Sequence, residues 1–151
     1  RTFSIRPGML PKGVIEILKV EGLDTEDFLS DFAVEVKNVC QKPIYKITFY
    51  IDFLNCFPAA GQNRCGLMLC YSNRIFHKME PPNEGDKPIL PGETVAIKFS
   101  PEESKGLREA LKEGIVREGL FDKLSIWFQA ANFGDGTGYH LINCCDGRWK
   151  D

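Results

Sequence analysis

Six cysteines are the most reactive side chains of this sequence, and their spacing points to disulfide chemistry. They are Cys40, Cys56, Cys65, Cys70, Cys144 and Cys145. An even number near predicted strand ends and loops favours disulfides, although six cysteines allow 15 pairings. Cys56 and Cys65 bracket a loop rich in Gly, Pro and Asn, so we expect this pair to close it locally. The adjacent Cys144 and Cys145 point in opposite directions in an extended chain, which favours two separate partners among Cys40, Cys65 and Cys70.

Metal binding and nucleophilic catalysis are the alternatives for these cysteines. Four residues separate Cys65 from Cys70, a gap that some zinc sites tolerate, but no second paired motif with histidine follows at finger-like spacing. A cysteine beside a histidine makes a nucleophile, yet a cysteine held in a disulfide cannot form the thiolate that attacks. We therefore expect structural disulfides, and we predict no catalytic residue, no metal and no cofactor. The protein is predicted not to be an enzyme.

Two further groups of residues have the types that ligand sites use. Asp135, Gly136 and Thr137 offer oxygens to calcium, but they fall short of the six to eight oxygen ligands that calcium takes, which favours a hairpin turn. Tyr50 and Trp127 are predicted on the outer faces of their strands. They form either a platform for a sugar or a surface that packs beneath the helix or a partner, and packing is favoured.

A period-two pattern predicts the strands that must position these groups. Tyr45, Ile47, Phe49, Ile51 and Phe53 alternate with Lys46, Thr48, Tyr50 and Asp52, as in a strand buried on one face. Similar patterns predict strands near residues 14–20, 32–39, 67–71, 94–99, 124–130 and 139–142. The count is about seven strands, with a glycine-rich turn before the last one.

One short helix is predicted directly after Phe99, between the strands near residues 94–99 and 124–130. Ser100 is a helix cap, Pro101 suits the first helical position, and Glu103 completes a capping box. Apolar residues then recur at helical spacing and Gly114 marks the end; the apolar stripe is Leu107, Ala110 and Leu111. We expect a mainly β fold, an immunoglobulin-like antiparallel sandwich with this one crossover helix.

The composition fits one domain. The chain has 151 residues, 43% of them hydrophobic and 26% charged, with a net charge of −2. This charge gives no electrostatic reason to expect nucleic acid, and the apolar runs are far shorter than the roughly 20 residues of a membrane span. Pro7, Gly8 and Pro11 punctuate an extended arm over residues 1–13, and residues 14–151 form the predicted sandwich. We expect an extracellular or cell-surface protein whose signal peptide has been removed.

Three segments carry a resemblance to a known group of proteins. They are VKNVCQKPIYKITFYIDF, LPGETVAIKFSPEESKGLREAL and IWFQAANFGDGTGY, about a third of the chain. The segments resemble exported bacterial proteins of undefined function, best represented in Acidobacteria, with an immunoglobulin-like sandwich and a DGT-type turn. This chain departs from them with Cys40, where Ser or Thr is usual, and Tyr139, where Trp is common. The resemblance implies a fold and export, and it implies no substrate.

Two functions follow as hypotheses. The first is a non-catalytic extracellular structural or adhesive subunit that self-assembles into a filament. In this hypothesis the arm adds a strand to a copy of the same chain and buries Phe3 and Ile5 at alternate positions. The alternative is a monomeric secreted module that binds a ligand or glycan. Surface glycans and another cell-surface protein are the other partners considered.

Overall fold

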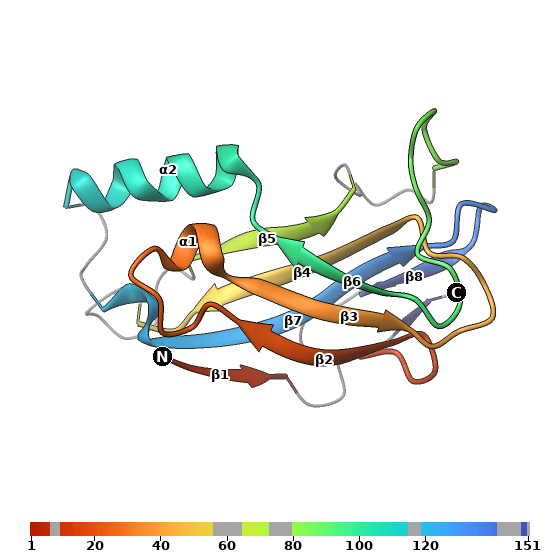
Figure 1. Cartoon of the computed structure of the whole chain (residues 1–151), viewed down its shortest axis with the longest axis horizontal. Helices are drawn as coiled ribbons and strands as arrows, with labels where there is room; N and C mark the ends of the chain where they lie inside the picture. The colour runs from red at the N-terminus through yellow and green to blue at the C-terminus, as the bar shows by residue number, and fades with distance from the viewer. Residues whose placement is uncertain (7–9, 56–64, 73–79, 115–118, 142–148, 151) are drawn as a thin grey trace.

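The computed structural model describes every residue except 7–9, 56–64, 73–79, 115–118, 142–148 and 151. The described chain forms two β-sheets packed face to face, with two α-helices toward one end (Figure 1). In chain order the elements are β1 (Thr2–Ile5), β2 (Ile15–Glu21), α1 (Phe28–Asp31), β3 (Ala33–Asn38), β4 (Lys46–Phe53), β5 (Cys65–Tyr71), β6 (Thr94–Lys98), α2 (Pro101–Lys112), the 3₁₀ helix η1 (Leu120–Asp122), β7 (Lys123–Asn132), β8 (Gly138–Leu141) and β9 (Trp149–Lys150).

The strand order is that of an antiparallel sandwich. The smaller sheet has the order β2-β3-β6, and the larger sheet runs β5-β4-β7-β8-β9 with β1 also beside β7. The chain builds β2 and β3 in one sheet, crosses to build β4 and β5 in the other, returns for β6, and crosses again through α2 to reach β7 and β8. The predicted mainly β sandwich with a crossover helix is confirmed.

β4 lies between β5 and β7 and is buried on both faces. Its apolar row from Ile47 to Phe53 faces the core and is at most 1% exposed. The prediction that only one face is buried is wrong, because Lys46, Thr48 and Asp52 on the other face are also buried. Alternation identifies the apolar face of a strand, but it carries no information about what covers the polar face.

Aromatic side chains fill the core near the helices. Phe28 of α1 lies 5.1 Å from Phe32 and 4.8 Å from Phe121, measured between ring centroids, and Phe32 stacks on Phe99 at 5.1 Å. The helix α1 was not predicted, because the acidic residues before it indicated only a turn. Its four residues are too few for a helical period to show in the sequence, and it forms where Phe28 and Leu29 become buried.

The sequence signals of α2 are confirmed in detail. The Ser100 side chain accepts a hydrogen bond from the amide of Glu103, and the Glu103 carboxylate accepts one from the amide of Ser100, which is the capping box. Gly114, at a φ of 69°, follows the helix and donates its amide to the Leu111 oxygen. Leu107 is buried against the core, so the predicted stripe seats α2 on the sandwich.

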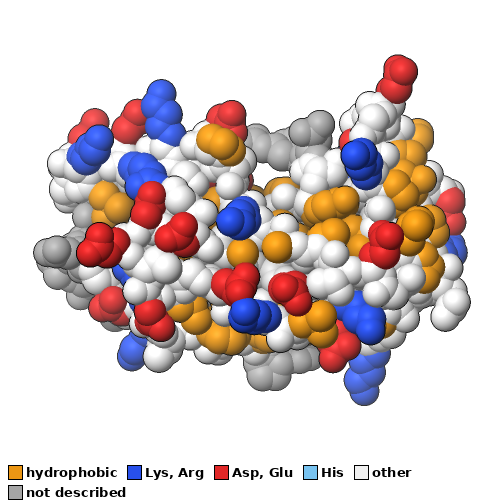
Figure 2. All heavy atoms as spheres, viewed as in Figure 1, with side chains coloured by type: hydrophobic (Ala, Val, Ile, Leu, Met, Phe, Trp, Pro, Cys, Tyr) orange, Lys and Arg blue, Asp and Glu red, His pale blue; other side chains and the backbone are white. Residues whose placement is uncertain are grey.

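The outer face of the smaller sheet is charged and solvated. In the register of β2 and β3, Glu16 is opposite Lys37 and Lys19 is opposite Glu35. Opposite charges on neighbouring strands stabilise a solvent-facing sheet modestly. Figure 2 shows lysines, arginines and acidic residues intermingled over the side of the molecule that carries this sheet.

Candidate functional site

The first candidate site is the contact between the N-terminal arm and the larger sheet. β1 runs parallel to β7, in a register that extends from the pair Thr2–Lys123 to the pair Ile5–Ile126. β8 pairs with the same side of β7 only over the last three residues of that strand. β1 therefore fills the stretch of β7 edge that β8 leaves open. Of the two predicted arm residues, Phe3 is 41% exposed, whereas Ile5 packs partly buried against the core.

Arg6, directly after β1, covers one of the two predicted platform residues. Its guanidinium carbon lies 3.9 Å from the ring centroid of Trp127, and its amide donates to the Ile126 oxygen at 3.2 Å. Trp127 is 5% exposed, and its indole N–H donates to the Ser125 hydroxyl at 2.9 Å. Tyr50 is the register partner of Trp127 and is half-buried. The two predicted residues are thus neighbours, in a packed arrangement in which Arg6 lies on the indole.

A second arginine holds the start of β1. The Arg1 guanidinium donates to the backbone oxygens of Leu23 at 2.7 Å and Thr25 at 3.0 Å. The same group lies 5.0 Å from the ring centroid of Phe28. Arginine side chains therefore tether both ends of a strand whose own residues are mostly exposed. No pattern in the sequence indicated this role for Arg1 or Arg6, because each contact joins segments far apart along the chain.

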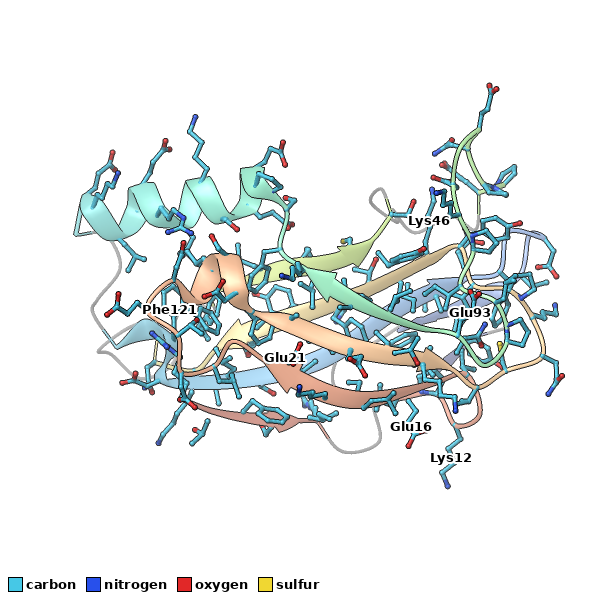
Figure 3. All side chains as sticks on the ribbon, viewed as in Figure 1. Lys12, Glu16, Glu21, Lys46, Glu93 and Phe121 are labelled. Atoms are coloured by element: carbon cyan, nitrogen blue, oxygen red, sulfur yellow. The ribbon has the colours of Figure 1, made fainter. Side chains whose placement is uncertain are left out.

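The second candidate site is one end of the sandwich, where the three segments that carry the family resemblance meet. We call this the loop end; it comprises residues 38–42, 89–93 and 132–138. Asn38 is 1% exposed, and its amide nitrogen donates to the oxygens of Lys42 and Ile89, both at 2.8 Å. Its backbone pairs with the Glu93 oxygen at 2.9 Å and with the Gly92 amide at 2.8 Å. Figure 3 shows Glu93 toward this end, away from Phe121 and the helices.

The DGT turn is tied to the same corner through a lysine. Lys42 Nζ donates to the Asp135 carboxylate at 2.8 Å and to the Thr137 hydroxyl at 3.1 Å, and it lies 5.3 Å from the Phe133 ring centroid. Asp135 also accepts the Thr137 amide at 2.9 Å. The hydrogen bond from Lys42, followed by those from Thr137, holds the pKa of the Asp135 carboxyl well below its usual range. The segment is a turn between β7 and β8, in which Gly136 has a φ of 85°.

A pocket of about 340 Å³ opens beside this turn. Its lining combines cationic, aromatic and hydroxyl groups with one thiol, supplied by Lys12, Cys40, Lys42, Thr137 and Tyr139. Figure 3 shows Lys12 extending away from the ribbon at this end. The residues come from three separate stretches of chain, so their spacing in sequence gave no sign of a shared pocket.

The predicted disulfides remain a prediction. The Sγ of Cys40 lies 3.2 Å from the Lys42 oxygen, and the described residues give this cysteine no disulfide partner. The Sγ of Cys70 lies 3.9 Å from the Thr48 hydroxyl, and Cys65 begins β5. Cys56, Cys144 and Cys145 lie outside the described residues, as does the loop that Cys56 and Cys65 were expected to close.

Comparison with known proteins returned no family model, no curated protein and no solved structure that matches this chain. Within the described ranges, no group of three or more His, Cys, Asp or Glu side chains is placed to share a metal ion. Neither described α-helix has the length and apolar character of a membrane span.

Proposed function

We propose that this chain is a non-catalytic structural or adhesive subunit that works outside the cell and associates with copies of itself by exchanging β1. The single observation that carries the proposal is the pairing of β1 with β7. The β7 edge accepts a parallel strand over Thr2–Ile5, and that strand comes from the end of the arm. The same contacts form whether the strand belongs to the same copy or to a neighbour, which is the condition for strand exchange.

The attachment of β1 is weak enough for exchange. A ladder of four residues supplies a few backbone hydrogen bonds, each worth about 0.5–1.5 kcal/mol net. Only Ile5 adds appreciable burial against the core, since Phe3 remains 41% exposed. The tethers made by Arg1 and Arg6 add to these contacts, so opening costs a few kcal/mol of the roughly 5–15 kcal/mol that stabilises a domain. Because exchange restores these contacts in a second copy, protein concentration decides how much of it occurs.

The hydrogen bonds between the resembling segments at the loop end support a scaffold role. Hydrogen bonds join the polar side chains of Asn38, Lys42 and Asp135 to one another or to neighbouring backbone, so these residues brace the loops. The extracellular location rests on the resemblance to exported bacterial proteins. A durable brace suits a subunit that must keep its shape while its arm pairs elsewhere.

Cross-linking between two different variants tests the exchange. Ser4 and Ser125 are register partners across β1 and β7, so we would prepare Ser4→Cys and Ser125→Cys as separate chains and mix them under mild oxidation. A disulfide-linked heterodimer on a non-reducing gel is the expected result. As a matched control for the native cysteines, the Ser4→Cys chain is mixed with a Thr94→Cys chain, whose new thiol lies on the exposed face of β6. If the mixture cross-links no more than this control, while a Ser4→Cys/Ser125→Cys double variant closes within one chain, strand exchange is wrong.

A ligand-binding module is the second candidate, favoured by the pocket at the loop end rather than by Tyr50 and Trp127. The pocket presents Tyr139 and Thr137 beside Lys12 and Lys42, a mixture of aromatic and hydrogen-bonding groups that suits a sugar or another small polar ligand. Glycan-array binding that Tyr139→Ala abolishes and Trp127→Ala leaves intact would support it. An array without any binding would remove this candidate.

A further inference from the structure

The outer strand β5 differs from the other long edge strands of the sandwich because it carries no charge. Its sequence is CGLMLCY, and its described ladder runs only to β4. The edge strand β2 has Glu16, Lys19 and Glu21 and a register shift between Ile17 and Lys19. The edge strand β6 ends with Lys98. Charged side chains and bulges are the usual means by which a sheet edge avoids pairing with another chain, and β5 has neither.

Among the described residues, two apolar side chains of β5 that face the core are partly exposed. Leu67, Leu69 and Tyr71 alternate toward the other sheet, and Leu69 is fully buried. Leu67 and Tyr71 pack against the core cluster but remain partly exposed. A further strand beside β5 would cover both of them.

One face of β5 is covered by a tyrosine of the neighbouring strand β4. Gly66 has no side chain, and the Tyr50 ring fills the space above it: a Cβ at Gly66 would lie 2.4 Å from Cζ of Tyr50. Met68, the register partner of Tyr50, is the middle residue of the strand.

We propose that β5 is a self-association edge that pairs antiparallel with β5 of a second copy, about a two-fold axis at Met68. This register sets Leu67 opposite Leu69 and Gly66 opposite Cys70, so no charge is brought against another charge. A second copy is the partner that the sequence of the edge fits, because an uncharged, β-prone strand is complementary to itself. Two copies would then share one continuous sheet, in an isologous interface.

This edge is independent of β1. The larger sheet has β5 at one side, and β1 pairs with β7 on the other side of β4. The inference shares self-association with the proposed function, but it requires no exchange of the arm. Each can therefore fail alone.

A charge-swap experiment at the two-fold axis tests the pairing. Met68→Lys and Met68→Glu each place like charges opposite each other in a homodimer, whereas a 1:1 mixture places lysine opposite glutamate. We expect sedimentation velocity to show at least a tenfold weaker dimer for each variant alone and recovery in the mixture. Recovery also excludes misfolding as the cause of the loss. Thr94→Lys, on the β6 edge, is the matched control and should leave the dimer unchanged.

Two results would overturn the inference. One is association of both Met68 variants as tight as that of the unmodified chain, and the other is a mixture that stays as weak as its components. The cross-link between Ser4→Cys and Ser125→Cys, repeated with Met68→Lys in both chains, separates the two surfaces. A retained cross-link with no effect of Met68→Lys on the dimer would reject the β5 edge and leave strand exchange standing.

Discussion

The loop end yields the sharpest stability prediction, the replacement of Asn38 by alanine. The Asn38 side chain makes three hydrogen bonds: to the oxygens of Lys42 and Ile89 at 2.8 Å each, and from the Cys40 amide at 3.0 Å. Alanine removes all three. The Ile89 oxygen still accepts the Ile44 amide, so no buried group is left without a partner, and each lost hydrogen bond costs about 0.5–1.5 kcal/mol. The expected loss is therefore about 2–4 kcal/mol.

Urea unfolding followed by circular dichroism at neutral pH measures this loss directly. For a domain of this size, it corresponds to a fall in Tm on the order of 10 °C. Asn83→Ala is the matched control, because Asn83 is exposed and bonds Asp86 through its backbone; its effect should stay within about 0.5 kcal/mol. A loss below about 1 kcal/mol for Asn38→Ala would refute the reasoning, since the loop end would then hold together without this network.

Three further variants test separate contacts. Asp135→Asn should lower stability at neutral pH. Because the pKa of Asp135 is lower in the folded chain, the stabilisation from its carboxylate is complete above about pH 4 and declines as the pH falls below that value. Unfolding curves of the two proteins should therefore converge in acid. Gly66→Ala would place its Cβ 2.5 Å from a backbone oxygen of β4 and should lower the free energy of unfolding in urea by about 1–3 kcal/mol. An unchanged free energy of unfolding would show that β5 can shift to accept the methyl group. Arg6→Ala should uncover Trp127, which acrylamide quenching in a Trp149→Phe background would detect; unchanged quenching would contradict the stacking.

Local patterns predicted the framework because local physics determines it. Alternation located β4, and the capping box at Ser100 and Glu103 located the start of α2 to the residue. Both patterns depend on residues within one strand or one turn of helix. The helix α1 was not predicted, because its four residues are fixed by the burial of Phe28 and Leu29, a tertiary contact that no local sequence pattern indicates.

The candidate sites were harder to predict because each is assembled from distant segments. Trp127 was correctly assigned to a strand, but its covering by Arg6 joins residues that lie far apart in sequence and depends on the parallel pairing of β1. The quoted segments around Asn38 and Asp135 were recognised as distinctive without any indication that they touch. Lys42, which links them, was given no role from the sequence, because only the fold brings its ammonium beside Asp135.

The placement of β1 and β5 determines what kind of assembly self-association could build. Reciprocal exchange of β1 between two copies closes a dimer, while exchange passed from each copy to the next leaves an open chain. β5 lies at the other side of the larger sheet and pairs isologously, so it closes when used alone. Only the use of both edges by the same copy, or open exchange of β1, extends beyond a dimer. A chain with Met68→Lys and with residues 1–6 deleted should therefore be monomeric, and each single change should leave the association of the other edge measurable.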